Sequence, residues 1–136
     1  NWHLLKIARA DNYYDVLRIN TAGFLSETAV ANFFFIRNNR LHSPSISTGV
    51  LPGVTRKVVL HNARLAEIDT QEGSYSLDAL KDIDAAFITN ASIGIIPVGS
   101  IEGETVQIHA SSESHSIVTK LIDLLALAQN RDLLLL

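Results

Sequence analysis

Short apolar runs separated by turn-forming residues make up most of the chain, and a few longer stretches repeat apolar residues with a helical period. The expected strands cover residues 15–20, 24–28, 29–36, 41–43, part of 67–71, 85–89, 95–101 and 105–108. The expected helices cover residues 2–10, a stretch that starts near residue 54, residues 77–83 and residues 114–130. Because strands and helices are interleaved, the pattern predicts a mixed α/β fold in which helices cover a mixed β-sheet.

Local features refine several of these elements. The run Phe33-Phe34-Phe35-Ile36 does not alternate with polar residues, which indicates a strand buried on both faces. Residues 37–40 (Arg-Asn-Asn-Arg) are expected to form a polar hairpin tip, and Ser76 is placed to cap the helix over 77–83. Strands 95–101 and 105–108 are expected to form a hairpin around Glu102-Gly103-Glu104.

Length and composition are those of one globular domain. The chain has 136 residues, of which 47% are apolar and 18% charged, and no repeat or linker divides residues 1–136. A net charge of -3 without a Lys/Arg cluster argues against a nucleic-acid partner. No apolar run is long enough to span a bilayer, and no signal peptide is recognisable. The absence of Met, including at residue 1, leads us to expect further sequence upstream of Asn1.

Cysteine and histidine usage narrows the possible chemistry. With no cysteine there is no disulfide framework, thiolate metal site or cysteine nucleophile, which fits a reducing cytoplasm. The five histidines lie in different expected elements, and no two have metal-ligand spacing, so no metal site is expected. The sequence also contains no nucleotide-binding glycine loop and no Gly-x-Ser-x-Gly elbow.

The stretch Leu51-Pro52-Gly53-Val54-Thr55-Arg56 turns a loop into a helix. Pro and Gly end the irregular segment, and an amphipathic run follows at once. The first backbone N–H groups of this helix, around Val54 and Thr55, have no partner within the helix and lie at the positive end of its dipole. Such a helix start suits a phosphate, although an ordinary Pro-Gly turn before a helix has the same pattern.

Two further segments accompany this helix start. Residues 23–36 place Glu27 between two apolar strands, and residues 87–98 form a buried strand that ends in Asn90-Ala91-Ser92-Ile93-Gly94 before Pro97-Val98. In this order the three segments resemble the class IV aminotransferases, the pyridoxal-phosphate enzymes of fold type IV, over about residues 1–101. The resemblance is to the larger C-terminal domain of the family, which implies a mixed β-sheet or pseudo-barrel with covering helices. The smaller N-terminal domain of that family has no counterpart in this chain.

The resemblance implies cofactor contacts for Glu27, Gly53, Val54, Thr55, Ala91 and Ser92. Glu27 corresponds to the glutamate that keeps the pyridine nitrogen of the cofactor protonated; the alternative is a strand-end carboxylate in solvent or in an ion pair. The N–H groups of Val54 and Thr55, with the Thr55 hydroxyl, correspond to the phosphate cradle. Ala91 stands where the transaminases usually carry a phosphate-binding threonine, so only the N–H groups of Ala91 and Ser92 are expected to contribute there.

The catalytic lysine is expected outside this chain. The lysine of the family binds the cofactor covalently and moves the proton, and it lies just before an Asn that is followed by a large residue. Asn1-Trp2 matches that pair, so the resemblance places the lysine upstream of Asn1. Lys6 lies on the wrong side of the pair and is expected to be a helix-surface charge.

A few positions distinguish subgroups of the family. Asn90-Ala91 before Gly94, and Ala31 before Asn32, look more like the 4-amino-4-deoxychorismate lyases than the transaminases. Asn32 corresponds to an asparagine that braces the loop of the glutamate. The residues implied for the substrate side are Asn90, Ser92 and Ile93.

The resemblance therefore implies a pyridoxal-phosphate-dependent lyase that converts 4-amino-4-deoxychorismate to 4-aminobenzoate and pyruvate in folate biosynthesis. A D-amino-acid or branched-chain aminotransferase of the same family is the first alternative, and a non-catalytic anion-binding module is the second. A small-molecule substrate, a cytoplasmic location and a homodimer are expected.

Overall fold

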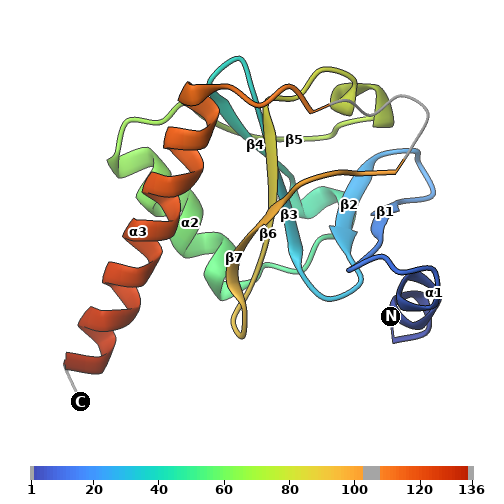
Figure 1. Ribbon diagram of the computed structural model, residues 1–136, viewed down its shortest axis with the longest axis horizontal. Helices are drawn as coiled ribbons and strands as arrows, with labels where there is room; N and C mark the ends of the chain where they lie inside the picture. The colour runs from blue at the N-terminus through green and yellow to red at the C-terminus, as the bar shows by residue number, and fades with distance from the viewer. Residues whose placement is uncertain (1, 103–107, 135–136) are drawn as a thin grey trace.

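The computed structural model describes residues 2–102 and 108–134, with side chains up to residue 129. Its main element is a five-stranded sheet with strand order β5-β4-β3-β6-β7, in which only β4 and β5 run parallel. The strands are β3 (Asn32–Arg37), β4 (Arg40–Pro44), β5 (Thr70–Gly73), β6 (Ala85–Asn90) and β7 (Gly94–Val98). A separate pair joins β1 (Leu17–Ile19) and β2 (Leu25–Thr28). The predicted mixed α/β fold is confirmed (Figure 1).

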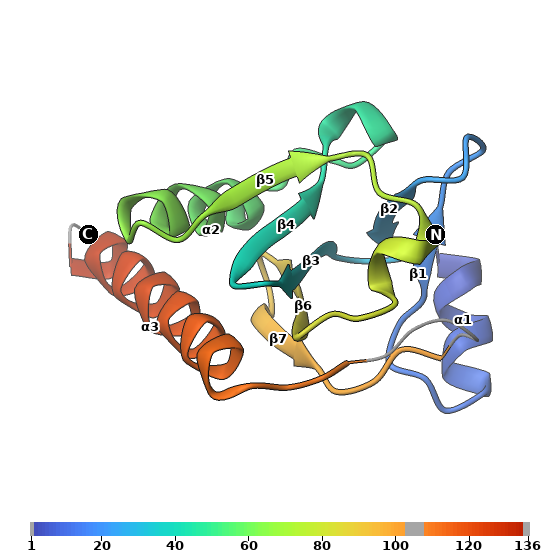
Figure 2. The same cartoon turned by 90° about the horizontal axis from the view of Figure 1, so that it is seen from above.

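In the described residues, three helices and two short 3-10 turns complete the fold. They are α1 (Trp2–Ala10), α2 (Val54–Leu65), α3 (Ser112–Leu134), η1 (Ile46–Thr48) and η2 (Leu77–Leu80). Figure 2 shows α2 and α3 side by side on one face of the sheet, with α1 at the opposite end of the molecule. None of the helices in the described part of the chain has both the length and the apolar character needed to cross a bilayer.

The sheet is buried on both faces at β3, as the unbroken apolar run predicts. Phe34 and Ile36 pack into a core shared with α2 and α3, where Phe34 stacks on Phe87 with ring centroids 4.8 Å apart. Phe33 and Phe35 point the other way, into a second core shared with η2 and β2. α2 packs on the face of the sheet that carries Phe34 and its partner Phe87. Because side chains alternate along a strand, the neighbouring residues on β3 and β6 point to the opposite face, into the second core.

The hairpin tip between β3 and β4 is also confirmed. Arg37 pairs with Arg40, and the two residues between them, Asn38 and Asn39, have φ angles of 53° and 60°. A two-residue turn of this kind requires positive φ at both positions, which asparagine tolerates better than most residues.

Several details differ from the expectation. Residues 29–31 form a bend rather than strand, because the Thr28 hydroxyl donates to the carbonyl of Ala31 and accepts from its N–H. Ser76 makes no side-chain capping bond, and η2 ends at Leu80 instead of continuing to residue 83. The strand expected over residues 95–101 is β7, which ends at Val98 and pairs antiparallel with β6. The expected hairpin around Glu102-Gly103-Glu104 falls largely on residues 103–107, outside the described ranges.

A buried histidine fixes the second core. His42 is 4% exposed, stacks on Phe35, and its Nδ1 lies 3.0 Å from the Tyr75 hydroxyl, which donates to the carbonyl of Gln71. Because the tyrosine has one proton to give, this arrangement assigns the proton of the neutral imidazole to Nδ1. Burial, and after it the charges of Arg37 and Arg40, lower the pKa of His42 to about 4.

Protonation of His42 is therefore expected to destabilise the fold. The unfolded chain takes up this proton near pH 6.5, whereas the folded chain resists it down to about pH 4. The stabilising contribution is complete above pH 6.5 and is lost as the pH falls toward 4, and at about 1.4 kcal/mol per unit it amounts to about 3 kcal/mol. Urea unfolding across this range should give a shallower pH dependence for His42→Gln than for the wild type, and equal slopes would contradict the assignment.

Candidate functional site

Three segments that are far apart in the sequence meet at one end of the five-stranded sheet. The β2–β3 bend, the start of α2 and the β6–β7 turn all lie in the lower part of Figure 1. Asn32 joins them, since its Nδ2 donates to Glu27 Oε2 at 3.3 Å and to the carbonyl of Leu51 at 3.0 Å, and it pairs with Thr89 on β6. The structure thus brings together the segments that the sequence singles out.

The Glu27 carboxylate is buried and held from one side. The residue is 8% exposed, and Oε2 accepts hydrogen bonds from Asn32 and from the backbone N–H of Leu51, the latter at 3.1 Å. Among the described residues no hydrogen bond reaches Oε1, and no ion pair involves this side chain. Neither solvent exposure nor an ion pair accounts for Glu27. One oxygen is fixed by the fold, and the other has no hydrogen-bond partner among the described residues.

Gly53 is required by close packing against Asn32. A Cβ atom at residue 53 would lie well inside contact distance of Asn32 Oδ1. The φ of Gly53 is -59°, which any residue adopts, so the reason for glycine is space and not backbone conformation. The turn is closed by a 2.8 Å hydrogen bond from the Gly53 N–H to the carbonyl of Leu51.

The helix start predicted at residue 54 is confirmed and carries free donors. The first backbone bond of α2 runs from the N–H of Lys57 to the carbonyl of Gly53, and no side chain caps the helix. The N–H groups of Val54 and Thr55 therefore have no partner within the helix, and no acidic residue lies in the first turn. Val54 is 77% exposed and Thr55 is 9% exposed. This geometry favours an anion in front of the helix.

Arg56, the next residue, points into the fold. Its side chain is 4% exposed, and Nη2 donates to the carbonyl of Pro44 at 3.1 Å and to Glu72 Oε1 at 2.7 Å. Arg64 contacts the other oxygen of Glu72 at 3.0 Å. The hydrogen bond from Arg56, aided by that from Arg64, holds the pKa of Glu72 below its ordinary value even though burial raises it. Arg56 therefore ties α2 to β5, which the sequence pattern did not reveal.

The β6–β7 turn is organised by Asn90. Its Oδ1 accepts from the N–H groups of Ser92 at 2.9 Å and Ile93 at 2.8 Å, and its Nδ2 donates to the carbonyl of Val30 at 3.0 Å. The amide of Asn90 is thus used by the turn itself. Because the Ser92 N–H is engaged, the Ala91 N–H and the Ser92 hydroxyl are the donors that this turn has left for a ligand.

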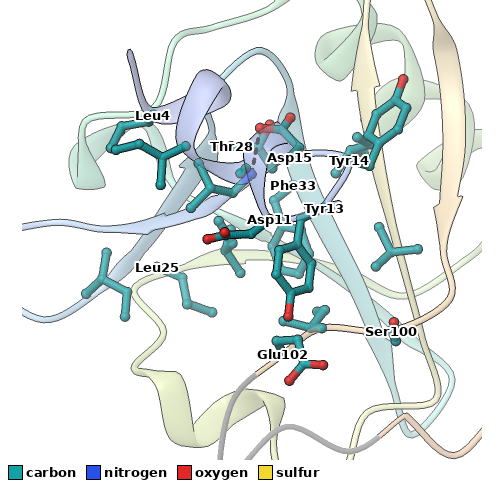
Figure 3. A pocket seen from close by; sticks show the side chains of 18 of the residues that line it. Leu4, Asp11, Tyr13, Tyr14, Asp15, Leu25, Thr28, Phe33, Ser100 and Glu102 are labelled. Carbon is teal, nitrogen blue, oxygen red and sulfur yellow. Dashed lines mark hydrogen bonds between the residues drawn. The ribbon is translucent and has the colours of Figure 1, made fainter. Parts of the chain in front are cut away.

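A separate cleft lies on the other side of the sheet, between α1 and β2. It has a volume of about 520 Å³, and Figure 3 shows Leu25 and Phe33 on its wall with Asp11, Asp15 and Glu102 around it. The described lining residues include these three carboxylates and no lysine or arginine, a distribution that repels a phosphate. None of the candidate cofactor residues lines this cleft.

Comparison with known proteins agrees with the convergence of the three segments. Residues 1–101 match the family model described as amino-transferase class IV. The chain belongs to the class IV amino-transferase family. Aminodeoxychorismate lyase of Bacillus subtilis is 36% identical over 80 residues, which cover 59% of this chain and 27% of that protein. Branched-chain-amino-acid aminotransferase 5 of Arabidopsis thaliana is 30% identical over 116 residues, which cover 84% of this chain and 28% of that protein.

A solved structure agrees with the fold in detail. A candidate 4-amino-4-deoxychorismate lyase from Legionella pneumophila superposes with a TM-score of 0.83 at 34% identity, covering 92% of this chain and 45% of that one. The chain therefore spans less than half the length of each of these three relatives.

Substitution of Gly53 tests the packing at this site. Gly53→Ala should push Asn32 away from Glu27 and Leu51 and lower the free energy of unfolding by about 1–3 kcal/mol. Gly99→Ala is the matched control, because an added Cβ there meets nothing within 4 Å. Urea unfolding measures both variants. In an Asn32→Ala background the clash is gone, so a full additional loss on Gly53→Ala would show that packing against Asn32 is not the cause.

Proposed function

We propose that this chain is the cofactor-binding part of a pyridoxal-phosphate-dependent lyase, most like 4-amino-4-deoxychorismate lyase. Family membership supports the cofactor class, and the meeting of Glu27 with the start of α2 through Asn32 is the observation that carries the site assignment. In this proposal residues 1–136 correspond to the C-terminal domain of the enzyme. The small N-terminal domain and the lysine that holds the cofactor belong to sequence that precedes Asn1.

The residues present fit the phosphorylated pyridine of this cofactor. Bound pyridoxal phosphate supplies an electron-accepting ring that stabilises negative charge developing on the substrate. Glu27 offers one free carboxylate oxygen, held rigidly through the other, to accept a hydrogen bond from the protonated ring nitrogen. A buried carboxylate whose geometry is fixed in advance holds that proton more effectively than a mobile, solvated one.

The phosphate fits the opposite end of the same site. The N–H groups of Val54 and Thr55, with the Thr55 hydroxyl, supply donors at the positive end of α2, and Gly53 allows the close approach of the turn. The Ala91 N–H and the Ser92 hydroxyl would add to this cradle from the β6–β7 turn. Ser92 and Ile93, with the ordered Asn90 turn behind them, would face the substrate.

The lyase is preferred over a transaminase on particular residues. Ala91 carries no hydroxyl, Ala31 precedes Asn32, and both the Bacillus and the Legionella relatives bear the lyase name. A D-amino-acid or branched-chain aminotransferase is the second candidate, favoured by the longer match to the Arabidopsis protein. The non-catalytic anion-binding module is the third. Lys6 is exposed on α1, consistent with a surface charge.

The full-length protein distinguishes these candidates. Supplied with aminodeoxychorismate, the lyase should release pyruvate and 4-aminobenzoate. Glutamate formed from an amino acid and 2-oxoglutarate, without pyruvate release, would instead establish the transaminase. Absence of both activities, together with no lysine labelled on borohydride reduction, would establish the binding module.

Glu27→Gln tests the role of the carboxylate in whichever reaction is found. Gln keeps an acceptor for the Leu51 N–H but loses the charge that holds the ring proton, so kcat should fall about 10²-fold or more. Asp123→Asn removes an exposed carboxylate on α3, outside the site, and is the control for loss of a negative charge. Wild-type kcat in Glu27→Gln would contradict the assignment.

We also propose a homodimer, on the basis of the family resemblance, and a cytoplasmic location, on the basis of the absence of cysteine. The net charge of -3 gives no reason to propose a nucleic-acid partner.

A further inference from the structure

The hydroxyl of Thr89 is buried without a hydrogen-bond partner. Thr89 is 0% exposed on β6, and Oγ1 has no donor or acceptor among the described residues. Valine would fill the same volume without desolvating a hydroxyl. Buried polar groups are nearly always paired in folded proteins, so this orphan group requires an explanation.

Thr89 lies directly opposite Asn32 in the antiparallel register of β6 and β3. Opposed residues project to the same face with Cβ atoms about 5 Å apart. That face is the one covered by α2, because the next pair on it, Phe34 and Phe87, stacks in the core shared with α2. Thr89 therefore faces Asn32 and the start of α2.

The Asn32 amide is satisfied on only one side. Its Nδ2 donates twice, to Glu27 and to Leu51, whereas its Oδ1 abuts Gly53 and accepts no hydrogen bond among those described. An unpaired acceptor and an unpaired donor thus project from neighbouring strands on the same face.

We propose that Thr89 is a positioning residue for Glu27 that acts through Asn32. In this proposal the Thr89 side chain rotates about χ1, and its O–H donates to Asn32 Oδ1 and completes the hydrogen bonding of the amide. The result is a relay across three strands, from Thr89 on β6 to Asn32 on β3 and to Glu27 on β2, which fixes the Glu27 carboxylate against the ring nitrogen. This inference rests on the proposed function, because the relay acts on the cofactor through Glu27.

Thr89→Val in the full-length protein removes the hydroxyl and keeps the shape. Without cofactor the variant should be as stable as the wild type or more stable, because an unpaired buried hydroxyl is lost. With pyridoxal phosphate as the probe, the Kd should rise about tenfold, the value of one hydrogen bond. Thr89→Ser restores the O–H and should restore wild-type affinity, although the lost methyl group lowers stability. If the hydroxyl served only the fold, Thr89→Val would lower stability and cofactor affinity together, and that result would contradict the proposal.

A double-mutant comparison with Asn32→Ala tests whether Thr89 acts on the cofactor through Asn32. In an Asn32→Ala background, Thr89→Val should change the Kd for pyridoxal phosphate by less than about twofold. The full tenfold loss in that background, or wild-type affinity in Thr89→Val alone, overturns the relay while leaving the proposed function standing. If the wild-type protein itself does not bind pyridoxal phosphate, the proposed function fails and the relay fails with it.

Discussion

The candidate site of this molecule depends on how one buried carboxylate is hydrogen-bonded. Glu27 accepts from the backbone of Leu51 and from Asn32, and Asn32 in turn holds the carbonyl of Leu51. An isolated charge removed from water costs several kcal/mol, so these hydrogen bonds constrain the chain strongly. They fix the turn that begins α2 against the β2–β3 bend, and thereby decide where the free N–H groups of the helix lie.

This constraint separates the two sides of the sheet chemically. On the α2 side the structure gathers unpaired backbone donors, one acid and small residues, which suits a phosphorylated ring. On the other side an apolar cleft carries Asp11, Asp15 and Glu102 without a described cation. This cleft is therefore a less suitable place for a phosphate than the start of α2.

Much of this arrangement was predictable from the sequence because it rests on local signals. The apolar run of β3, the Asn-Asn hairpin tip and the Pro-Gly helix start each act over a few residues, and the order of the three motifs indicates the family. The bend at residues 29–31 was missed because a side chain of Thr28 overrides apolar character there. The inward direction of Arg56 and the Thr89–Asn32 register arise from contacts between distant segments, which no local pattern encodes. The engaged N–H of Ser92 comes instead from a local turn closed by the Asn90 side chain, a signal that the sequence-based prediction did not use.

The most direct test of the account is a crystal structure of the full-length protein grown with pyridoxal phosphate. The account predicts the phosphate within hydrogen-bond distance of the N–H groups of Val54 and Thr55, and the ring nitrogen on Glu27 Oε1. A cofactor seated instead in the cleft beside Asp15, with Glu27 turned away from the ring, would contradict it.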